Sequence, residues 1–585
     1  MLPILQIQNL TVSFPETGNP IPALHNFSMD LNRGEVMAVV GESGSGKSVM
    51  SLALMKLLAK NAIVKGDSIL FSSDGENKVE LLGIDEKEFR FYRGKKLAMI
   101  FQEPMTSLNP VMTCGAQICE PLKFHKKLND RNAKAAALLL LQKVQITEPE
   151  KVYGKYPHQL SGGQRQRVMI AMAISCNPSV LICDEPTTAL DVIVQKTILD
   201  LLKNLCLSEN MSMIFITHDL GLVAEMADRV QVMLKGRVVE SGVVRELFKN
   251  PKNPYTRGLL MCRPSFYSKG NRLPVVSDFY IPENSGDANI NPVLPGRLSA
   301  DPKTDELKMK TDSVNSPGNS LQVLLRVKEL HVRYATGGNL PGIKKHWTDG
   351  IKNINFEVFK GEILGVVGES GSGKTTLGRA LLGLNKHFHG SISYEGLDLL
   401  KMKKSELRSF RRNIQIVFQD PYSSLNPRLM IGPAISEPIK AHELKDPSER
   451  KRSVLEMLKK VDLEPAYFTR YPHEFSGGQR QRIVIARALI LNPGFVVFDE
   501  SVSALDVSVQ AQILNLINDL KEKLGFTAVF ISHDLSVIRY LCERVIVMEK
   551  GEIVECGEVE EVYQNPKTEY TRSLIAAIPG KNLKF

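Results

Sequence analysis

The sequence has few cysteines and no long hydrophobic run, and these two absences exclude several classes of protein. Its eight cysteines form no CxxC pair and no Cys/His cluster with zinc spacing. Scattered thiols are typical of a reducing compartment, in which most cysteines act as small buried side chains. The longest apolar run, Ala135 to Leu141, is far shorter than the roughly 18 residues that cross a bilayer. Residues 1–10 lack the basic and apolar segments of a secretion signal. We therefore expect no disulfides, structural metal site, transmembrane helix or cleaved signal.

Composition and charge exclude few classes of protein. Apolar residues make up 43% and charged residues 24% of the chain, which is ordinary for a globular protein with sizeable cores. The formal net charge of +10 attracts polyanions of many kinds, including nucleic acid and anionic membrane surfaces. It therefore indicates non-specific attraction and identifies no partner.

The chain contains an internal duplication. The stretch GESGSGKS at residues 41–48 returns as GESGSGKT at 368–375, and YPHQLSGGQRQR at 156–167 returns as YPHEFSGGQRQR at 471–482. A constant offset of 315 residues relates three further pairs, namely Asp184 and Asp499, His218 and His533, and Tyr255 and Tyr570. The glycine-rich stretches are 327 residues apart, so the first half carries extra residues, for which polar residues 72–78 are a candidate surface insertion. The sequence therefore predicts two similar halves.

A segment of different composition separates the halves. Residues from about 267 to 320 are rich in Pro, Asn, Ser, Gly and Asp and show little periodicity, which is typical of a flexible linker. The alternative is an ordered arm that lies across the surface of one half. We expect one domain at residues 1–265, a linker at 266–322 and a second domain at 323–585.

Each half is expected to be α/β. Short apolar runs at 35–40, 180–183 and 213–217 have the length of buried strands, and residues 48–58 have helical spacing. The second half has corresponding runs at 362–367, 495–498 and 528–532. Strands that alternate with helices predict a mostly parallel sheet covered by helices.

Both glycine-rich stretches match the phosphate-binding pattern GxxxxGK[ST]. The glycines let backbone N–H groups approach phosphates, and the helix that follows adds a favourable dipole. The lysine is expected to reach the β- and γ-phosphates, and the next hydroxyl is expected to bind Mg²⁺. The predicted phosphate ligands are Gly41, Ser43, Gly44, Gly46, Lys47 and Ser48 in the first half and Gly368, Ser370, Gly371, Gly373, Lys374 and Thr375 in the second.

An apolar run ends in an Asp-Glu pair in each half. Asp184 and Asp499 are candidate Mg²⁺ ligands, because an Asp at a strand end can hold the metal's coordination shell. Glu185 and Glu500 are candidate catalytic residues that orient or deprotonate the attacking water. A lone Asp-Glu pair is most often solvated. Its place between SGGQ and a strand that ends in His favours the catalytic interpretation.

With these motifs in this order, the sequence resembles the ABC transporter ATPases over nearly its whole length apart from the linker. Each half carries a form of the family's signature motif, LSGGQ at 160–164 and FSGGQ at 475–479. The resemblance implies two P-loop ABC cassettes in one α/β chain. Each cassette would have a mixed RecA-like sheet core, a helical subdomain and an antiparallel β subdomain. ATP and Mg²⁺ are the implied cofactors.

The resemblance also implies roles for residues outside the phosphate loops. Gln102 and Gln419 match the glutamines that sense the metal and the water, and His218 and His533 match the switch histidines that contact the γ-phosphate. Residues 189–191 and 504–506 match the loop that communicates between cassettes. The aromatic residues expected to stack on adenine are Phe14 and Tyr334. The signature residues expected to bind ATP held by the opposite cassette are Ser161, Gly162, Gly163, Gln164, Ser476, Gly477, Gly478 and Gln479.

The second half departs from the family pattern after its Asp-Glu pair. The first half reads EPTTALD at 185–191, whereas the second reads ESVSALD at 500–506. The metal-binding Asp and the catalytic Glu are retained in both halves. We therefore expect hydrolysis at both sites, with a possible difference in rate between them.

Further stretches resemble one importer group within the family. FQEPMTSLNP at 101–110, FQDPYSSLNP at 418–427 and the tails at 253–260 and 568–575 look like those of ATPases that import peptides, nickel and glutathione. The fusion of two cassettes and the ESVSALD variant most resemble the glutathione-import subfamily, followed by fused oligopeptide-import ATPases. The resemblance implies a peripheral subunit on the cytoplasmic face of the bacterial inner membrane. Its implied partners are two permease subunits and a periplasmic or extracellular solute-binding protein, with no nucleic acid, and the two cassettes would pair within one chain.

A soluble ABC-type translation factor acting at the ribosome is the alternative from another class. Such factors also carry two cassettes and no membrane span, but a long, charged helical arm connects them. Residues 267–320 instead contain many Pro and Gly residues, with six Lys and Arg against seven Asp and Glu. That balance is unsuited to binding RNA phosphates.

Overall fold

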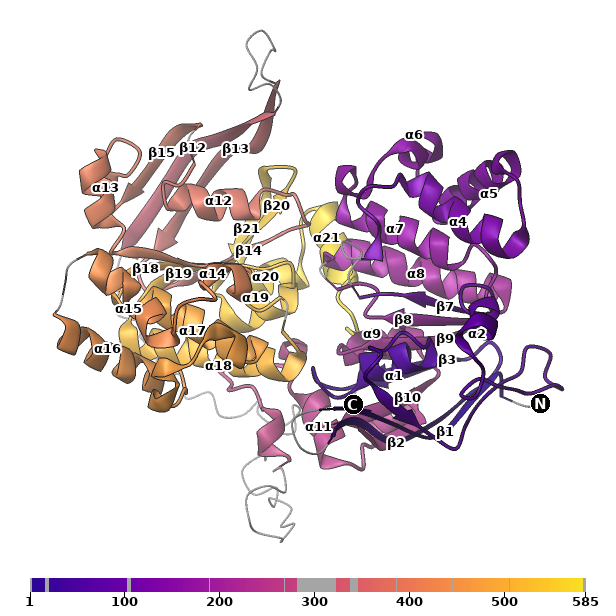
Figure 1. Ribbon diagram of the computed structural model, residues 1–585. Coiled ribbons are helices and arrows are strands. Elements are labelled where there is room, and N and C mark those ends of the chain that lie inside the picture. Colours follow the sequence, from indigo (N-terminus) through magenta and orange to yellow (C-terminus); the bar gives the residue numbers. More distant parts are fainter. Residues whose placement is uncertain are drawn as a thin grey trace. The chain divides into compact units, whose positions relative to one another are not determined.

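The chain divides into two structural units, which are described separately (Figure 1). The first contains Met1–Leu260 and Ala576–Phe585, and the second contains Met261–Ile575. Residues 281–321, most of the expected linker, lie outside the described residues. The computed structural model describes residues 3–15, 20–102, 107–188, 190–267, 269–280, 322–336, 346–385, 387–442, 444, 446–503 and 505–581.

The core of the first unit is a six-stranded sheet in the order β11-β10-β3-β9-β8-β7. Its strands are β3 (Val36–Val40), β7 (Leu97–Ile100), β8 (Val180–Asp184), β9 (Ser212–Thr217), β10 (Arg229–Leu234) and β11 (Arg237–Val243). All neighbouring pairs are parallel except the β10–β11 pair. Every residue of β3 is buried, as expected for a parallel strand with both faces covered. The mostly parallel sheet predicted from the short apolar runs is confirmed.

Helices cover this sheet and form a separate helical layer. Cys114, Ala133 and Leu141, from α4 and α5, lie in the same buried cluster as strand residues of the sheet. Helix α1 ends at Leu54, earlier than expected, because the chain turns at Lys56 with a φ of 51°. The helices are α1 (Lys47–Leu54), α2 (Glu86–Tyr92), α4 (Cys114–Lys126), α5 (Asp130–Lys143), α6 (Pro149–Gly154), α7 (Gly162–Ala173), α8 (Val192–Glu209), α9 (Leu220–Met226), α10 (Val244–Lys249) and α11 (Pro254–Met261).

An antiparallel sheet in the order β2-β1-β5-β6 completes the first unit, with β4 also paired to β1. Its strands are β1 (Leu5–Phe14), β2 (Ile21–Leu31), β4 (Ile63–Lys65), β5 (Ser68–Phe71) and β6 (Val79–Glu80). The candidate insertion at 72–78 forms the turn between β5 and β6, and it is exposed apart from Ser72 and partly buried Gly75. Asp74 holds this turn by accepting hydrogen bonds from the backbone N–H groups of Glu76 and Asn77.

The second unit repeats this architecture. Its antiparallel sheet has the order β13-β12-β15-β16 and its mixed sheet the order β17-β18-β19-β14-β20-β21. The strands are β12 (Val323–Thr336), β13 (His346–Phe359), β14 (Ile363–Val367), β15 (Phe388–Tyr394), β16 (Leu397–Asp398), β17 (Ile414–Val417), β18 (Phe495–Asp499), β19 (Thr527–Ile531), β20 (Arg544–Glu549) and β21 (Glu552–Glu558). The helices are α12 (Lys374–Leu381), α13 (Lys404–Phe410), α14 (Pro421–Ser424), α15 (Ile431–Ala441), α16 (Pro447–Lys460), α17 (Gly477–Leu489), α18 (Val507–Leu524), α19 (Leu535–Leu541), α20 (Val559–Gln564) and α21 (Glu569–Ala576). The predicted pair of α/β cassettes is therefore confirmed.

Within the described ranges, every helix is too short or too polar to cross a bilayer. The eight cysteines, all within the described ranges, form no disulfide, and all are buried except Cys556. Seven small thiols thus contribute to packing, as their scattered positions predicted.

Candidate active site

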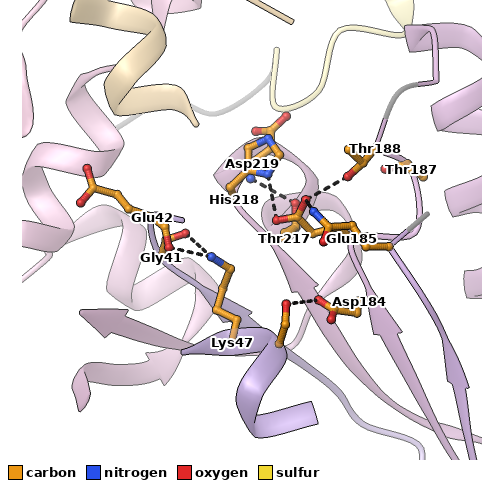
Figure 2. A network of polar contacts seen from close by, with 12 residues as sticks. Gly41, Glu42, Lys47, Asp184, Glu185, Thr187, Thr188, Thr217, His218 and Asp219 are labelled. Atoms are coloured by element: carbon orange, nitrogen blue, oxygen red, sulfur yellow. Dashed lines mark hydrogen bonds and ion pairs between the residues drawn. The ribbon is translucent and has the colours of Figure 1, made fainter. Parts of the chain in front are cut away.

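A glycine-rich loop joins β3 to α1 and surrounds the side chain of Lys47. Gly46 has a φ of 99°, and a Cβ at this position would lie 2.8 Å from the carbonyl oxygen of Ala23, so the loop requires glycine here. Figure 2 shows the Lys47 ammonium donating to the carbonyls of Gly41 and Glu42, at 2.7 and 2.9 Å. Lys47 is only 6% exposed. A buried ammonium beside the N-terminus of a helix favours an anionic ligand.

The second unit has the same loop between β14 and α12. Lys374 donates to the carbonyls of Gly368 and Glu369, at 2.7 and 2.8 Å. Gly373 has a φ of 102°, and a Cβ there would lie 2.7 Å from the carbonyl oxygen of Gly350. Both predicted phosphate cradles therefore have the same local geometry.

A hydroxyl and a carboxylate meet beside each loop. Ser48, in the first turn of α1, donates to Asp184 Oδ1 at 3.2 Å, and Ser51 donates to the other carboxylate oxygen at 3.3 Å. In the second unit Thr375 donates to Asp499 Oδ1 at 3.1 Å. Burial raises the pKa of both aspartates. A hydroxyl beside a buried carboxylate is a set of oxygen ligands that suits Mg²⁺, so the chemistry of Ser48, Asp184, Thr375 and Asp499 fits this ion.

Two predicted residues, Gln102 and His218, converge on Glu185 together with Thr188, which was not predicted. Its carboxylate accepts hydrogen bonds from Gln102 Nε2 and Thr188 Oγ1, both at 3.0 Å, and lies 3.2 Å from His218 Nδ1. Figure 2 shows Thr188 and His218 directed at this carboxylate. Glu185 has a φ of 47°, and its N–H donates to the carbonyl of Ile216 at 3.0 Å. Left-handed backbone in a glutamate is uncommon and recurs at functional sites.

The contacts around Glu185 keep its carboxylate ionised. Burial alone raises the pKa of this group, but the hydrogen bond and charge of His218 lower it, as do Thr188 and Lys47. The net pKa is about 2. Glu185 therefore carries a negative charge at neutral pH and can accept a hydrogen bond from water.

Glu500 occupies the corresponding place in the second unit with different contacts. Gln419 Nε2 donates to its carboxylate at 2.7 Å, whereas His533 Nδ1 and Lys374 Nζ each lie 3.8 Å from its oxygens. Burial raises the pKa of Glu500, but His533 and Lys374 lower it below its usual value. The Ser503 hydroxyl donates to the backbone carbonyl of Glu500 at 2.9 Å. Thr188 thus donates to the side-chain carboxylate of Glu185, whereas Ser503, at the corresponding position, donates to the backbone of Glu500.

The substitution of Thr by Val after the second Asp-Glu pair removes another polar contact. In the first unit, Gln195 Nε2 donates to Thr187 Oγ1 at 3.1 Å. Val502 stands at the corresponding position, is 2% exposed and has no hydroxyl to accept such a bond. The sequence departure thus changes the hydrogen bonding near Glu500, the predicted catalytic residue, while retaining the glutamate itself.

The signature residues form a helix cap in each unit. Ser161 Oγ accepts the N–H of Gln164, and Gln164 Oε1 accepts the N–H of Ser161, both at 3.3 Å. Ser476 and Gln479 form the same reciprocal pair at the start of α17, at 3.4 and 3.1 Å. This capping box fixes the start of a helix whose N-terminal dipole favours an anion. Of the two loops expected to communicate between cassettes, Asp191 caps α8 through the N–H of Val194, whereas Ala189 and Ala504 lie outside the described residues.

The two predicted adenine-stacking residues differ in their surroundings. Phe14 is partly buried against the apolar core of its unit. Tyr334 is 40% exposed, and its hydroxyl donates to Thr376, next to the second phosphate loop, at 3.2 Å. Gly350 accommodates the Tyr334 ring, because a Cβ at Gly350 would lie 2.7 Å from Tyr334 Cε2. Tyr334 is therefore the more available aromatic surface of the two.

Two tyrosines also contact the phosphate loops, and the sequence did not predict this role. Tyr255, on α11, accepts the N–H of Glu42 at 3.2 Å, and Tyr570, on α21, accepts the N–H of Glu369 at 2.9 Å. The constant offset of 315 residues marks these tyrosines as equivalent positions of the duplication, but it does not indicate a contact with the loops.

Together these groups combine an anion cradle, an oxygen-ligand pair and an ionised carboxylate within each unit. The cradle suits a nucleotide phosphate, and the carboxylate suits a water molecule that attacks it. Residues far apart in sequence thus meet in an arrangement that can hydrolyse a nucleoside triphosphate.

Comparison with known proteins defines the class of protein. The sequence profile of the ABC transporter family matches residues 24–188 and 351–503, together more than half of the chain. The chain therefore belongs to the ABC transporter family and is one of its ATP-binding ATPases. The profile of the oligopeptide/dipeptide transporter C-terminal region matches residues 239–278 and 554–583.

Similar curated proteins extend over nearly the whole chain. The glutathione import ATP-binding protein GsiA of Pectobacterium atrosepticum is 44% identical over 584 residues, which cover 99% of this chain and 90% of the relative. GsiA of Escherichia coli K12 is 44% identical over 582 residues, which cover 98% and 89% of the two chains. A solved dimeric ATP-binding cassette with ADP and Pi is 30% identical, covers 40% of this chain and 99% of its own, and has a TM-score of 0.37. The two GsiA relatives and the ABC transporter profile give no support to the ribosomal alternative.

Proposed function

We propose that the chain is the ATP-hydrolysing subunit that energises import of glutathione or other small peptides through a separate membrane permease. The observation that carries this proposal is the convergence of Gln102, Glu185 and His218 beside a phosphate loop, together with near-full-length similarity to glutathione import ATP-binding proteins. The matched oligopeptide/dipeptide C-terminal region supports peptides as the class of solute.

In this proposal, Lys47 and Lys374 bind the β- and γ-phosphates of ATP, and the backbone N–H groups of the glycine-rich loops bind the remaining phosphate oxygens. Bound Mg²⁺ would neutralise charge that develops on the phosphates. The residues that would hold the ion are Ser48, Asp184 and Gln102 in the first cassette and Thr375, Asp499 and Gln419 in the second.

Glu185 and Glu500 position and polarise the attacking water. Each carboxylate is ionised and held by a glutamine amide, so its orientation is fixed before the substrate binds. His218 and His533 contact these carboxylates and are placed to bind the γ-phosphate. As the family resemblance implies, Ser161 and Ser476 act on nucleotide bound by the opposite cassette.

The proposed partners are two permease subunits and a solute-binding protein outside the membrane. The described helices contain none that crosses a bilayer, so transport requires a membrane partner. We propose that the chain lies peripherally on the cytoplasmic face of the inner membrane, where ATP is supplied.

Uptake of labelled glutathione, and separately of a labelled oligopeptide, tests the proposal. Cells that lack the chain are complemented with the natural protein, with Glu185→Gln/Glu500→Gln, or with the control Glu246→Gln, which changes an exposed glutamate on α10. We expect glutathione uptake to disappear without the chain and in the double variant, but not in the control. Loss of oligopeptide uptake alone would assign the solute to that class. Persistence of both uptakes would overturn the proposal.

A further inference from the structure

A hollow on the antiparallel sheet of the second unit is lined by histidine, arginine and aromatic side chains. Its volume of about 610 Å³ falls within the range of small-molecule sites, roughly 300–1,000 Å³. The strands that form it, β12, β13 and β15, are neighbours in this sheet (Figure 1). We call it the histidine hollow, and its lining residues are His331, Arg333, Trp347, His387, Phe388 and His389.

The histidine hollow lies on the face of the sheet opposite the predicted adenine-stacking residue. The Tyr334 hydroxyl reaches Thr376, next to the second phosphate loop. Successive side chains of a strand point to opposite faces of the sheet, so Arg333 points the other way. Trp347 shares the face of Arg333, because it lies two residues from Asp349, the cross-strand partner of Arg333. A ligand in the hollow therefore does not take the place of the adenine.

Asp349 fixes the side chain of Arg333 and leaves part of it available. Arg333 Nε donates to Asp349 Oδ1 at 2.9 Å, and His331 Nε2 lies 2.9 Å from the same oxygen. The hydrogen bonds of His331 and Arg333 lower the pKa of Asp349, so its carboxylate is ionised at neutral pH. Among the described residues, neither terminal nitrogen of Arg333 has a hydrogen-bond partner. A guanidinium in this state can bind a planar acidic group through two parallel hydrogen bonds.

Trp347 and two further imidazoles complete the lining. Trp347 is 49% exposed, and its ring contacts the His387 ring edge to face, with centroids 5.0 Å apart and planes at 84°. His389 lies opposite His331 in the β12–β15 pair. The ring nitrogens of His387 and His389 form no hydrogen bond to another described residue. The hollow thus combines an indole surface, which packs well on planar rings, with donors that suit an acidic group.

The first unit has different side chains at the corresponding positions. An offset of 320 residues places Thr11 at the position of His331. The same offset places Ser13 at the position of Arg333. Lys65, opposite Thr11 in the β1–β4 pair, stands where the second unit has a histidine. Both units keep the predicted ATPase residues, so the lining of the hollow is not explained by the chemistry that they share.

We propose that the histidine hollow binds a small aromatic anion, a planar ring that carries a carboxylate or a phosphate, and that it does so on the second cassette alone. The ring stacks on Trp347. The acidic group accepts hydrogen bonds from Arg333 and from the imidazoles of His387 and His389. The inference goes beyond the proposed transport function, because neither ATP nor the imported solute enters it.

Tryptophan fluorescence of the full-length protein tests this site, because Trp347 is the single tryptophan of the chain. The purified protein is titrated with benzoate and, separately, with phenyl phosphate. We expect a saturable change at millimolar or lower concentration, and the anion that binds more tightly identifies the acidic group. Cyclohexanecarboxylate and inorganic phosphate, which carry the charge without the planar ring, should bind much more weakly. Absence of a saturable change with both aromatic anions would overturn the proposal, as would equal binding of the non-aromatic ones.

Arg333→Gln keeps the tryptophan and is expected to weaken binding about tenfold, through loss of charge-assisted hydrogen bonds. Arg326→Gln is the matched control, because Arg326 is another exposed arginine of β12 whose Nε donates to a carboxylate, that of Glu357, at 2.6 Å. Its binding should equal that of the natural chain. ATP binding by each variant shows that its cassettes remain folded. Natural affinity in Arg333→Gln would contradict the proposed site.

Equilibrium dialysis with the radiolabelled aromatic anion counts the sites. We expect one molecule bound per chain, with an affinity that ADP and Mg²⁺ change by no more than about twofold, since the hollow and Tyr334 lie on opposite faces of the sheet. Trp347→Ala, which has no fluorescence to follow, should bind about fivefold more weakly in this assay. Two molecules per chain, or displacement by ADP, would place the anion in the nucleotide sites and overturn the proposal.

Discussion

Each glutamate proposed to be catalytic is held in an unfavourable backbone conformation by its surroundings. Glu185 and Glu500 have φ values of 47° and 46°, and their N–H groups donate to Ile216 and Ile531 at 3.0 Å. A non-glycine residue in this region costs on the order of 1–3 kcal/mol, which the rest of the fold must offset. The duplication repeats this backbone conformation at both glutamates.

Thr188 and Ser503 are predicted to contribute unequally to hydrolysis. Thr188→Val removes a hydrogen bond to the Glu185 carboxylate and is expected to lower the rate of phosphate release about fivefold, the effect of one hydrogen bond of about 1 kcal/mol. Ser503→Ala removes a bond to a backbone carbonyl, so the rate should remain within about twofold of the natural rate.

Thr188→Ser keeps the hydroxyl and is expected to restore most of the activity. Because Thr188 acts through Glu185, it is a positioning residue, and the KM for ATP should change much less than kcat. Equal losses in Thr188→Val and Ser503→Ala would contradict the asymmetry.

The low pKa of Glu185 predicts a particular dependence of stability on pH. Its pKa is about 2 in the folded protein against an ordinary value of 4.5, so the folded state favours the ionised form. The resulting stabilisation is present above about pH 4.5 and is lost as the pH falls towards 2. Its magnitude is about 3 kcal/mol. Urea unfolding of Glu185→Gln from pH 6 to pH 3 should show a shallower loss of stability than the natural protein.

The exposed control Glu246→Gln is expected to follow the natural protein through this pH range. An unchanged slope in Glu185→Gln would show that the contacts of His218 and Thr188 do not hold the carboxylate in its ionised form.

At the scale of elements, the signature helices pack closely on the helices that follow them. A Cβ at Gly163 would lie 2.8 Å from Val194 Cγ1, and a Cβ at Gly478 would overlap Val509 Cγ1. The neighbouring Gly162 has more room, since a Cβ there would lie 3.5 Å from Leu190 Cδ2. The second glycine of each signature thus permits close approach of two helices.

Gly163→Ala is therefore predicted to destabilise the first cassette by about 1–3 kcal/mol through overpacking, measured as the free energy of unfolding in urea. Gly162→Ala is the matched control, with an expected change within about 1 kcal/mol. Gly163→Ala/Val194→Ala removes the methyl groups that collide and should recover part of the loss. Equal stability of Gly163→Ala and Gly162→Ala would contradict this packing.

Elements whose signal is local were predictable from the sequence. The run at 35–40 predicted a buried strand, because a strand covered on both faces has no polar side to interrupt it. The glycine-rich loops were predictable because their function requires fixed residues at fixed spacing. Helix α1 was expected to end later, since the turn at Lys56 leaves no clear sequence signal.

Contacts that depend on distant residues were not predictable. Tyr255 reaches the Glu42 N–H across 213 residues, and the different directions of the Thr188 and Ser503 hydroxyls depend on the packing around each glutamate. The composition of the expected linker is typical of a flexible segment, yet Lys269, Arg272 and Leu273 within it contact Glu543, Asp519 and Asn515. The alternative of an ordered arm describes that part of the segment better.

At the scale of the whole molecule, the duplication supplies two sets of candidate ATPase residues in one chain. Each unit has its own buried core and its own phosphate loop, carboxylate pair and signature helix. The two sets differ in the hydrogen bonds around Glu500, and both keep their carboxylates. We therefore propose that the chain hydrolyses ATP at both sites, and we expect the different contacts around Glu185 and Glu500 to give different rates.

Phosphate release from ATP in the presence of Mg²⁺ tests this account most directly. The purified natural chain is compared with Glu185→Gln/Glu500→Gln and with the control Glu246→Gln. The account predicts that the double variant still binds ATP but releases phosphate at least about 100-fold more slowly than the natural chain. The control should hydrolyse ATP at the natural rate. Hydrolysis by the double variant at the natural rate would contradict the assignment of the two glutamates and, with it, the account of both sites.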